Sequence, residues 1–257
     1  MPLVVGTSGW QYRDWRGVLY TEGLPQRAWL RRFAEEFPTV EVNNAFYRLP
    51  ERAVFERWRD ETPPGFVVAV KVSRYLTHIK RLRDPAEPVA RLTARAAGLG
   101  DRLGPYLLQL PPTLRASPDV LDACLACFPR GARVAVEPRH GSWWTDEVRD
   151  VLTRRRAALC WADRLGRPAA PLWRTADWGY VRMHEGTASP RPSYGRRALA
   201  TWLDRIDAAW RLTSDGADVF VFFNNDRGGA AVRNARTLCR MAGYRGMAVA
   251  VTPPTPA

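Results

Sequence analysis

The chain has 257 residues, of which 46% are hydrophobic and 25% are charged. This composition is typical of a folded globular protein and argues against a disordered chain. No apolar run is long enough to cross a bilayer, so we expect no membrane-spanning helix. The formal net charge of +13 favours an anionic partner, although arginines in helical patterns also fit a solvated outer face.

The N-terminus "MPLVVGTSGW" has neither a basic leader segment nor a cleavage site, so we expect a cytoplasmic protein without a membrane partner. The four cysteines include Cys124 and Cys127, which lie in the amphipathic stretch "DVLDACLACF". We expect them to be reduced and to pack in the core. A zinc or redox pair is the alternative.

Short apolar runs alternate with helical patterns along the chain. Several helices have start signals, at Pro25, at Ser117 and at Thr145. This alternation predicts parallel strands joined by helical crossovers, and eight such units in this length predict a (β/α)₈ barrel. The predicted strands are 3–10, 40–47, 66–73, 106–112, 134–140, 158–163, 180–186 and 219–226.

A doubly wound open sheet is the rival α/β fold. Its dinucleotide form requires a G-x-G-x-x-G turn, which "GTSGWQYRDW" does not supply, so no nucleotide cofactor is expected. We therefore predict a single TIM-type barrel domain over residues 1–250 and a disordered tail at 251–257. The barrel is expected to be slightly irregular, because the proline-broken segment "RLGRPAAPLWRTADWG" leaves no regular helix between strands six and seven.

Polar side chains follow the carboxyl ends of nearly all the predicted strands. All three histidines lie at or just beyond such ends, and Lys71 lies inside an apolar strand, where an unpaired ammonium is costly. Because barrel enzymes place their chemistry at this end, we predict one polar site there. The candidate catalytic residues are His184, Glu137, Glu41 and Lys71. The candidate substrate-binding residues are Trp10, Tyr12, Asn43, Tyr47, His78, Gln109, Arg139, Asp163, Arg182, Asn224 and Asn225.

Two alternatives involve no chemistry. The buried charges could form an ion-pair lattice that closes the barrel. The aromatic residues after strands one and five could form a hydrophobic plug, which is the preferred interpretation for Trp15 and Trp144.

Seven motifs resemble the YecE-like family, also called domain of unknown function 72, in order and style over nearly the whole chain. They are "GTSGWQYRDWRGVLY", "VEVNNAFYRLP", "FVVAVKVSRYLTH", "LGPYLLQLPP", "VAVEPRHGSWW", "YVRMHEG" and "VFVFFNNDRGGAAVRNA". The resemblance implies a TIM-type barrel and highlights the candidates above, but it implies no established activity. Two positions depart from the family pattern. Glu185 stands between His184 and Gly186, and Asp226 occupies a position that is often histidine.

Three functions fit these residues. The first is an enzyme that acts on an anionic, phosphate-containing substrate. The most specific version of this hypothesis is hydrolysis of a phosphodiester in nucleic acid, in which a divalent metal could take part. The second is a metal-free acid/base enzyme acting on a phosphorylated small molecule. The third is a non-catalytic binder of nucleic acid. The sequence does not determine the metal or the oligomeric state.

Overall fold

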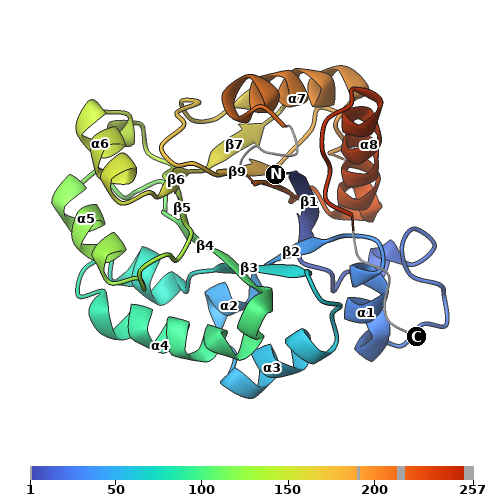
Figure 1. Ribbon diagram of the computed structural model, residues 1–257, viewed down its shortest axis with the longest axis horizontal. Helices are drawn as coiled ribbons and strands as arrows, with labels where there is room; N and C mark the ends of the chain where they lie inside the picture. The colour runs from blue at the N-terminus through green and yellow to red at the C-terminus, as the bar shows by residue number, and fades with distance from the viewer. Residues whose placement is uncertain (1, 190–191, 213–217, 252–257) are drawn as a thin grey trace.

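The computed structural model describes residues 2–189, 192–212 and 218–251, and in these ranges a ring of parallel strands is surrounded by helices (Figure 1). The predicted tail at 251–257 lies outside the described residues except for Val251. Among the described residues, no helix has both the length and the apolar character needed to span a membrane. The strands are β1 Leu3–Ser8, β2 Thr39–Val42, β3 Val67–Lys71, β4 Leu103–Gln109, β5 Val134–Glu137, β6 Ala158–Leu159, β7 Trp161–Arg164, β8 Arg167–Pro168, β9 Gly179–Met183 and β10 Val219–Phe223.

The strands close into a barrel. β1 pairs in parallel with β2 on one side and with β10 on the other. β6 and β7 are consecutive parts of one extended segment interrupted at Cys160, and they pair in parallel with β5 and β9 respectively. The backbone N–H of Cys160 still donates to the carbonyl of Val136 at 2.8 Å. The TIM-type barrel predicted from the sequence is therefore confirmed, with β8 as a short antiparallel addition to β7.

Helices cover the outside of the ring (Figure 1). Ser117 and Thr145 occupy the predicted N-cap positions of α5 and α6, and the Thr145 side chain accepts a hydrogen bond from the Val148 N–H at 3.4 Å. Residues 165–178, all of them described, contain no helix, as the proline-broken sequence predicted. The α-helices are α1 Trp29–Ala34, α2 Asn44–Tyr47, α3 Arg52–Asp60, α4 Ala86–Ala96, α5 Pro118–Ala126, α6 Asp146–Arg154, α7 Arg196–Trp210 and α8 Ala230–Tyr244.

Two apolar clusters stabilise the barrel. The larger one lies between the strands and the helices, while the smaller one fills the barrel interior. In the interior, small side chains on β3, β5 and β6 face large aromatic ones on β9 and β10, which lets the layers interdigitate. The small residues are Ala69, Ala135 and Ala158, and the aromatic ones are Tyr180, Phe220 and Phe222.

All the predicted strands except 158–163 are longer than the observed ones at their carboxyl ends. The prediction for 40–47 is wrong after Val42, because the chain turns at Asn43 into the short helix α2. The four cysteines are free thiols. Cys124 is buried on the core side of α5, as expected, and Cys127 is half-buried.

Candidate active site

A layer of polar side chains fills the barrel at the carboxyl ends of its strands. Four of its members follow, two residues later, an apolar side chain of the barrel interior, and side chains two apart in a strand point to the same face. The polar layer therefore lies directly above the apolar one. The pairs are Ala69 and Lys71, Leu107 and Gln109, Ala135 and Glu137, and Tyr180 and Arg182.

Arg182 lies at the centre of this layer and is 1% exposed. Its Nη2 donates to Glu41 Oε1 at 2.8 Å, and its Nη1 donates to Glu137 Oε2 at 2.6 Å and to Gln109 Oε1 at 3.1 Å. Burial alone lowers the pKa of Arg182, but the two carboxylates outweigh burial and hold the pKa above its ordinary value. Arg182 is therefore a permanent charge shared by two acids.

Both acids are ionised and fully occupied. Burial raises the pKa of each carboxyl, but Arg182 and the other partners outweigh it, so the pKa of Glu41 is lowered and that of Glu137 is lowered strongly. The Tyr180 hydroxyl donates to the second oxygen of Glu41 at 2.7 Å. The second oxygen of Glu137 accepts from Arg139 Nη2 at 3.1 Å and contacts His184 Nε2 at 2.9 Å. Neither carboxylate has an oxygen free of a protein partner.

His184 extends the network toward the surface. Its Nε2 lies 2.9 Å from Glu137 Oε1 and its Nδ1 lies 3.0 Å from Asn224 Nδ2. With both ring nitrogens engaged, the imidazole is oriented by the protein. This geometry suits His184 and Asn224 to positioning Glu137.

Arg139 marks the opening of the layer to solvent. Its side chain is 39% exposed, while its guanidinium bonds Glu137 Oε1 and Gln109 Oε1, the latter at 3.3 Å. Beside it lies a cleft of about 590 Å³ that is also lined by Glu137, His184 and Asn224. An anion entering this cleft meets a guanidinium that is already oriented.

Lys71 differs from the other cations of the layer. It is 9% exposed, and its Nζ lies 4.2 Å from the centre of the Phe46 ring. No hydrogen bond or ion pair joins its ammonium to another of the described residues. Burial and then the charge of Arg182 lower its pKa to about 8, against the opposing effect of Glu41 and Glu137. A buried amine with this pKa exchanges its proton near neutral pH.

Three further candidates lie around the Lys71 side of the layer. His78 meets Phe46 edge to face at 5.0 Å and shares a hydrogen bond of 2.9 Å with the Thr77 hydroxyl, and burial followed by the charge of Lys71 lowers its pKa. Asn43 follows β2, and its Oδ1 is buried without a hydrogen-bond partner among the described residues. Tyr47 is 74% exposed.

Four candidates are engaged in the surrounding structure. Trp10 is 4% exposed and packs edge-on against Trp58 in the core, and the Tyr12 hydroxyl donates to the Ser8 carbonyl at 2.6 Å. Asp163 faces the helices, where its oxygens accept from the Tyr194 hydroxyl at 2.5 Å and from Trp202 Nε1 at 2.6 Å. Asn225 donates to the Pro192 carbonyl at 2.8 Å and to Asn234 Oδ1 at 2.9 Å, which braces the loop after β10.

One residue of the layer, Tyr180, was missed by the sequence reasoning. Tyr180 shares a strand face with Arg182, so the period of two along "YVRMH" offered a signal. Phe46, an aromatic residue at the end of the predicted strand 40–47 that the family resemblance also marks, covers the Lys71 amine from α2.

The donor set of the layer does not fit a divalent metal ion. The four carboxylate oxygens of Glu41 and Glu137 already accept hydrogen bonds, and Arg182 neutralises the pair. Within the described ranges, no group of three or more His, Cys, Asp and Glu side chains is arranged to hold a metal. We therefore derive no chemistry through a metal.

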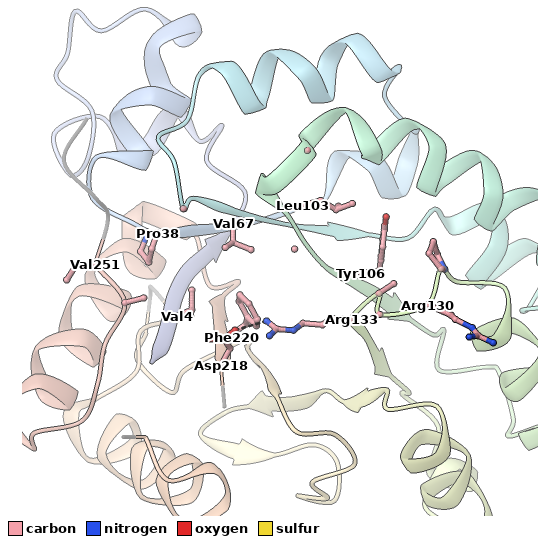
Figure 2. Close-up of a pocket in the computed structure, with 17 residues that line it drawn as sticks. Val4, Pro38, Val67, Leu103, Tyr106, Arg130, Arg133, Asp218, Phe220 and Val251 are labelled. Carbon is pink, nitrogen blue, oxygen red and sulfur yellow. Dashed lines mark hydrogen bonds and ion pairs between the residues drawn. The ribbon is translucent and has the colours of Figure 1, made fainter. Parts of the chain in front are cut away.

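A second cavity, of about 660 Å³, lies at the opposite end of the barrel (Figure 2). Its lining includes Val4, Val67 and Phe220 near the amino ends of their strands. Arg133 donates to Asp218 there at 2.7 Å, so this charge is compensated. In barrel proteins this end serves stability, and we place the candidate site at the other end, where the polar layer lies.

The chain matches known proteins over most of its length. The family described as "Protein of unknown function DUF72" matches residues 4–257. UPF0759 protein YecE of Escherichia coli K12 is 30% identical over 141 residues, which are 54% of this chain and 48% of YecE, so the match spans about half of that relative. UPF0759 protein YunF of Bacillus subtilis 168 is 24% identical over 280 aligned residues, covering 96% of this chain and 97% of YunF.

Solved structures share the fold. A DUF72 family protein from Thermotoga maritima MSB8 is 28% identical with a TM-score of 0.80, and the similarity covers 95% of this chain and all of that one. SacUVDE is 8% identical with a TM-score of 0.56, covering 96% of this chain and 99% of SacUVDE, which shows a common fold alone.

Proposed function

This chain belongs to the DUF72 family, and we propose that it is an enzyme that binds an anionic, phosphate-containing small molecule. The ligand binds at the carboxyl ends of the strands in the cup, by which we mean the polar layer and the cleft beside Arg139. The enzyme acts on the ligand by acid/base chemistry without a metal. One observation carries the proposal. Arg182 occupies both buried acids, whereas the ammonium of Lys71 has no hydrogen-bond or ion-pair partner among the described residues and the guanidinium of Arg139 borders the cleft.

The charges of the layer favour an anion. Three cations, Lys71, Arg139 and Arg182, stand against two carboxylates, Glu41 and Glu137, so the lysine, arginine and glutamate side chains of the layer sum to one positive unit (3 − 2). The layer is largely buried, so an excess charge there acts over a lower dielectric than on the surface. A phosphate group that enters the cleft beside Arg139 offsets this excess positive charge and accepts charge-assisted hydrogen bonds.

The proton carrier in this proposal is Lys71. Glu137 stays ionised and occupied, and His184 has both nitrogens engaged. Lys71, with a pKa of about 8, has both protonation states available near neutral pH. Glu41, Glu137 and His184 act in this mechanism by fixing Arg182 and Arg139.

The first test is the binding of inorganic phosphate and of phosphorylated sugars by titration calorimetry. Arg139→Ala is expected to weaken phosphate binding at least tenfold, because it removes a charge-assisted contact of about 2 kcal/mol. Arg91→Ala is the matched control, since Arg91 is an exposed arginine of α4 that pairs with Glu87. Equal affinities in all three proteins would refute the anion site.

A polynucleotide is the second candidate ligand. Tyr47 is 74% exposed and Tyr75 is 40% exposed, and the exposed Arg48 and Arg74 are their chain neighbours. Aromatic and basic groups together suit stacking on bases and contact with phosphates, and the net charge is +13.

This alternative predicts binding of single-stranded DNA or RNA with a steep dependence on salt, which Tyr47→Ala weakens and Glu137→Gln does not. A small-molecule enzyme predicts little such binding. Fluorescence anisotropy with a labelled oligonucleotide at several salt concentrations separates the two.

A further inference from the structure

We infer that Lys71 is a nucleophile that forms a Schiff base with the carbonyl carbon of its substrate, so the substrate class is an aldehyde or ketone that carries a phosphate or similar anionic group. The inference rests on the proposed function, because the same cup must hold the anionic end. It assigns the neutral amine of Lys71 to a covalent step in place of simple proton transfer, and it adds a carbonyl group to the ligand.

The position of Lys71 carries the inference. It ends β3, directly above the interior Ala69, and its side chain runs up the inside of the barrel. Its Nζ lies 4.2 Å from the centre of the Phe46 ring and makes no hydrogen bond or ion pair with another described residue. Arg182 and Arg139, by contrast, are held by carboxylates. A buried ammonium without such partners is unfavourable for folding, so a role of the free amine explains it.

The electrostatic environment makes this amine available as a nucleophile. Only the neutral form attacks a carbonyl, and with a pKa of about 8 roughly one molecule in ten carries neutral Lys71 at pH 7. For an ordinary lysine the fraction is roughly one in 2,500. Burial and Arg182 thus raise the supply of nucleophile by about two orders of magnitude.

The step balances without an oxidant or reductant. The nitrogen lone pair forms a bond to the carbonyl carbon, the C=O π electrons move to oxygen, and transfer of a proton from nitrogen to oxygen gives a carbinolamine. A proton from solvent then allows the hydroxyl to leave as water, and the product is a protonated imine. Glu41 and Glu137, whose charges already act on Lys71, stabilise that cation.

The chain offers a sharp test, because its only lysines are Lys71 and Lys80. Lys80 lies at the end of the turn that follows β3 and pairs with Asp84, whose side chain is 86% exposed. The probe is pyridoxal 5′-phosphate, which has an aldehyde and a phosphate, followed by borohydride reduction and peptide mass analysis that separates Lys71, Lys80 and the N-terminal amine. Phosphate binding is measured on the same protein.

We expect Lys71 to be labelled at least tenfold faster than Lys80, with a rate that rises with pH around 8 and falls in the presence of inorganic phosphate. Lys71→Arg should abolish this label, and Lys80→Arg should leave it unchanged. The pH profile is measured on the unmodified chain, so it tests the inference even if Lys71→Arg does not fold.

The outcomes distinguish the two proposals. Labelling confined to Lys80 and the N-terminus, with normal phosphate binding, overturns the Schiff base and leaves the anion site standing. Rapid labelling of Lys71 without any phosphate binding supports the nucleophile and overturns the proposed function. The absence of both overturns both.

Discussion

Replacing Lys71 by methionine is expected to stabilise the protein at neutral pH, although it removes the candidate reactive group. Methionine has a similar length and no charge, so it can fill the space beside Phe46 without the cost of burying an ammonium. The substitution therefore isolates the energetic cost of keeping Lys71 in the barrel.

The size of the effect follows from the pKa of Lys71. The pKa of Lys71 is about 8 in the folded protein, whereas the ordinary value of 10.5 applies to the unfolded chain. The difference of about 2.5 corresponds to roughly 3 kcal/mol. Between pH 8 and pH 10.5 the unfolded chain binds more protons at this site than the folded one, so the stability of the unmodified protein rises with pH in that window. Below pH 8 Lys71 is protonated in both states, so the full cost of burying its ammonium lowers the free energy of unfolding. The gain from Lys71→Met should be about 3 kcal/mol at pH 7 and should vanish near pH 10.5.

Urea denaturation of the two proteins at pH 6.5, 7.5, 9 and 10 measures this difference. Titration of the buried tyrosines affects both proteins and cancels in the comparison. Lys80→Met serves as the control, since Lys80 is a partly exposed lysine outside the polar layer, and it should change the free energy of unfolding by less than 0.5 kcal/mol. A loss of stability in Lys71→Met at pH 7, or a difference that does not change with pH, would refute the reasoning.

Three further predictions concern the polar residues. Arg182→Met should lower the free energy of unfolding by about 3–5 kcal/mol, because it leaves two buried carboxylates without their cation; a loss below 1 kcal/mol in urea denaturation would contradict the network. The pKa values of Glu41 and Glu137 are depressed in the folded protein, so their contribution is present above about pH 4.3 and is lost as the pH falls through the folded values. In Glu137→Gln the free energy of unfolding, followed by circular dichroism, should therefore fall less steeply as the pH is lowered. Asp163→Asn should cost about 1–3 kcal/mol, because an amide cannot accept from both Tyr194 and Trp202 as the carboxylate does, while the affinity for phosphate stays the same in calorimetry.

The barrel could be predicted because two features of the sequence indicate its strands. Each is a short apolar run, and nearly every run ends in polar groups that a buried strand does not otherwise tolerate. Glu137 shows this well, since it follows "VAV" at the end of β5 and its carboxylate accepts a hydrogen bond from Arg139 just beyond the strand. Closure of the ring then brings such ends together, as the bonds from Arg182 to residues 45 and 141 positions away show.

The direction of some side chains could not be predicted. "ALCWAD" is apolar on both faces, as is usual for a parallel strand. Its periodicity therefore does not indicate whether Asp163 points into the barrel or out toward α7, and the structure places it outward, against Trp202. The partners of a buried charge could not be predicted either, because these contacts depend on the register between strands that are distant in sequence.

The reactivity of Lys71 depends on how completely the two acids are occupied. A carboxylate with a free oxygen would pair with the ammonium and raise its pKa, whereas Tyr180, Arg182, Arg139 and His184 take all the oxygens of Glu41 and Glu137. The same Arg182 that holds the acids also repels a proton on Lys71. In the proposed Schiff-base mechanism the buried network therefore does more than close the barrel. Its carboxylates supply negative charge that stabilises a cationic intermediate at Lys71, while no hydrogen bond or ion pair joins the amine to them or to another described residue.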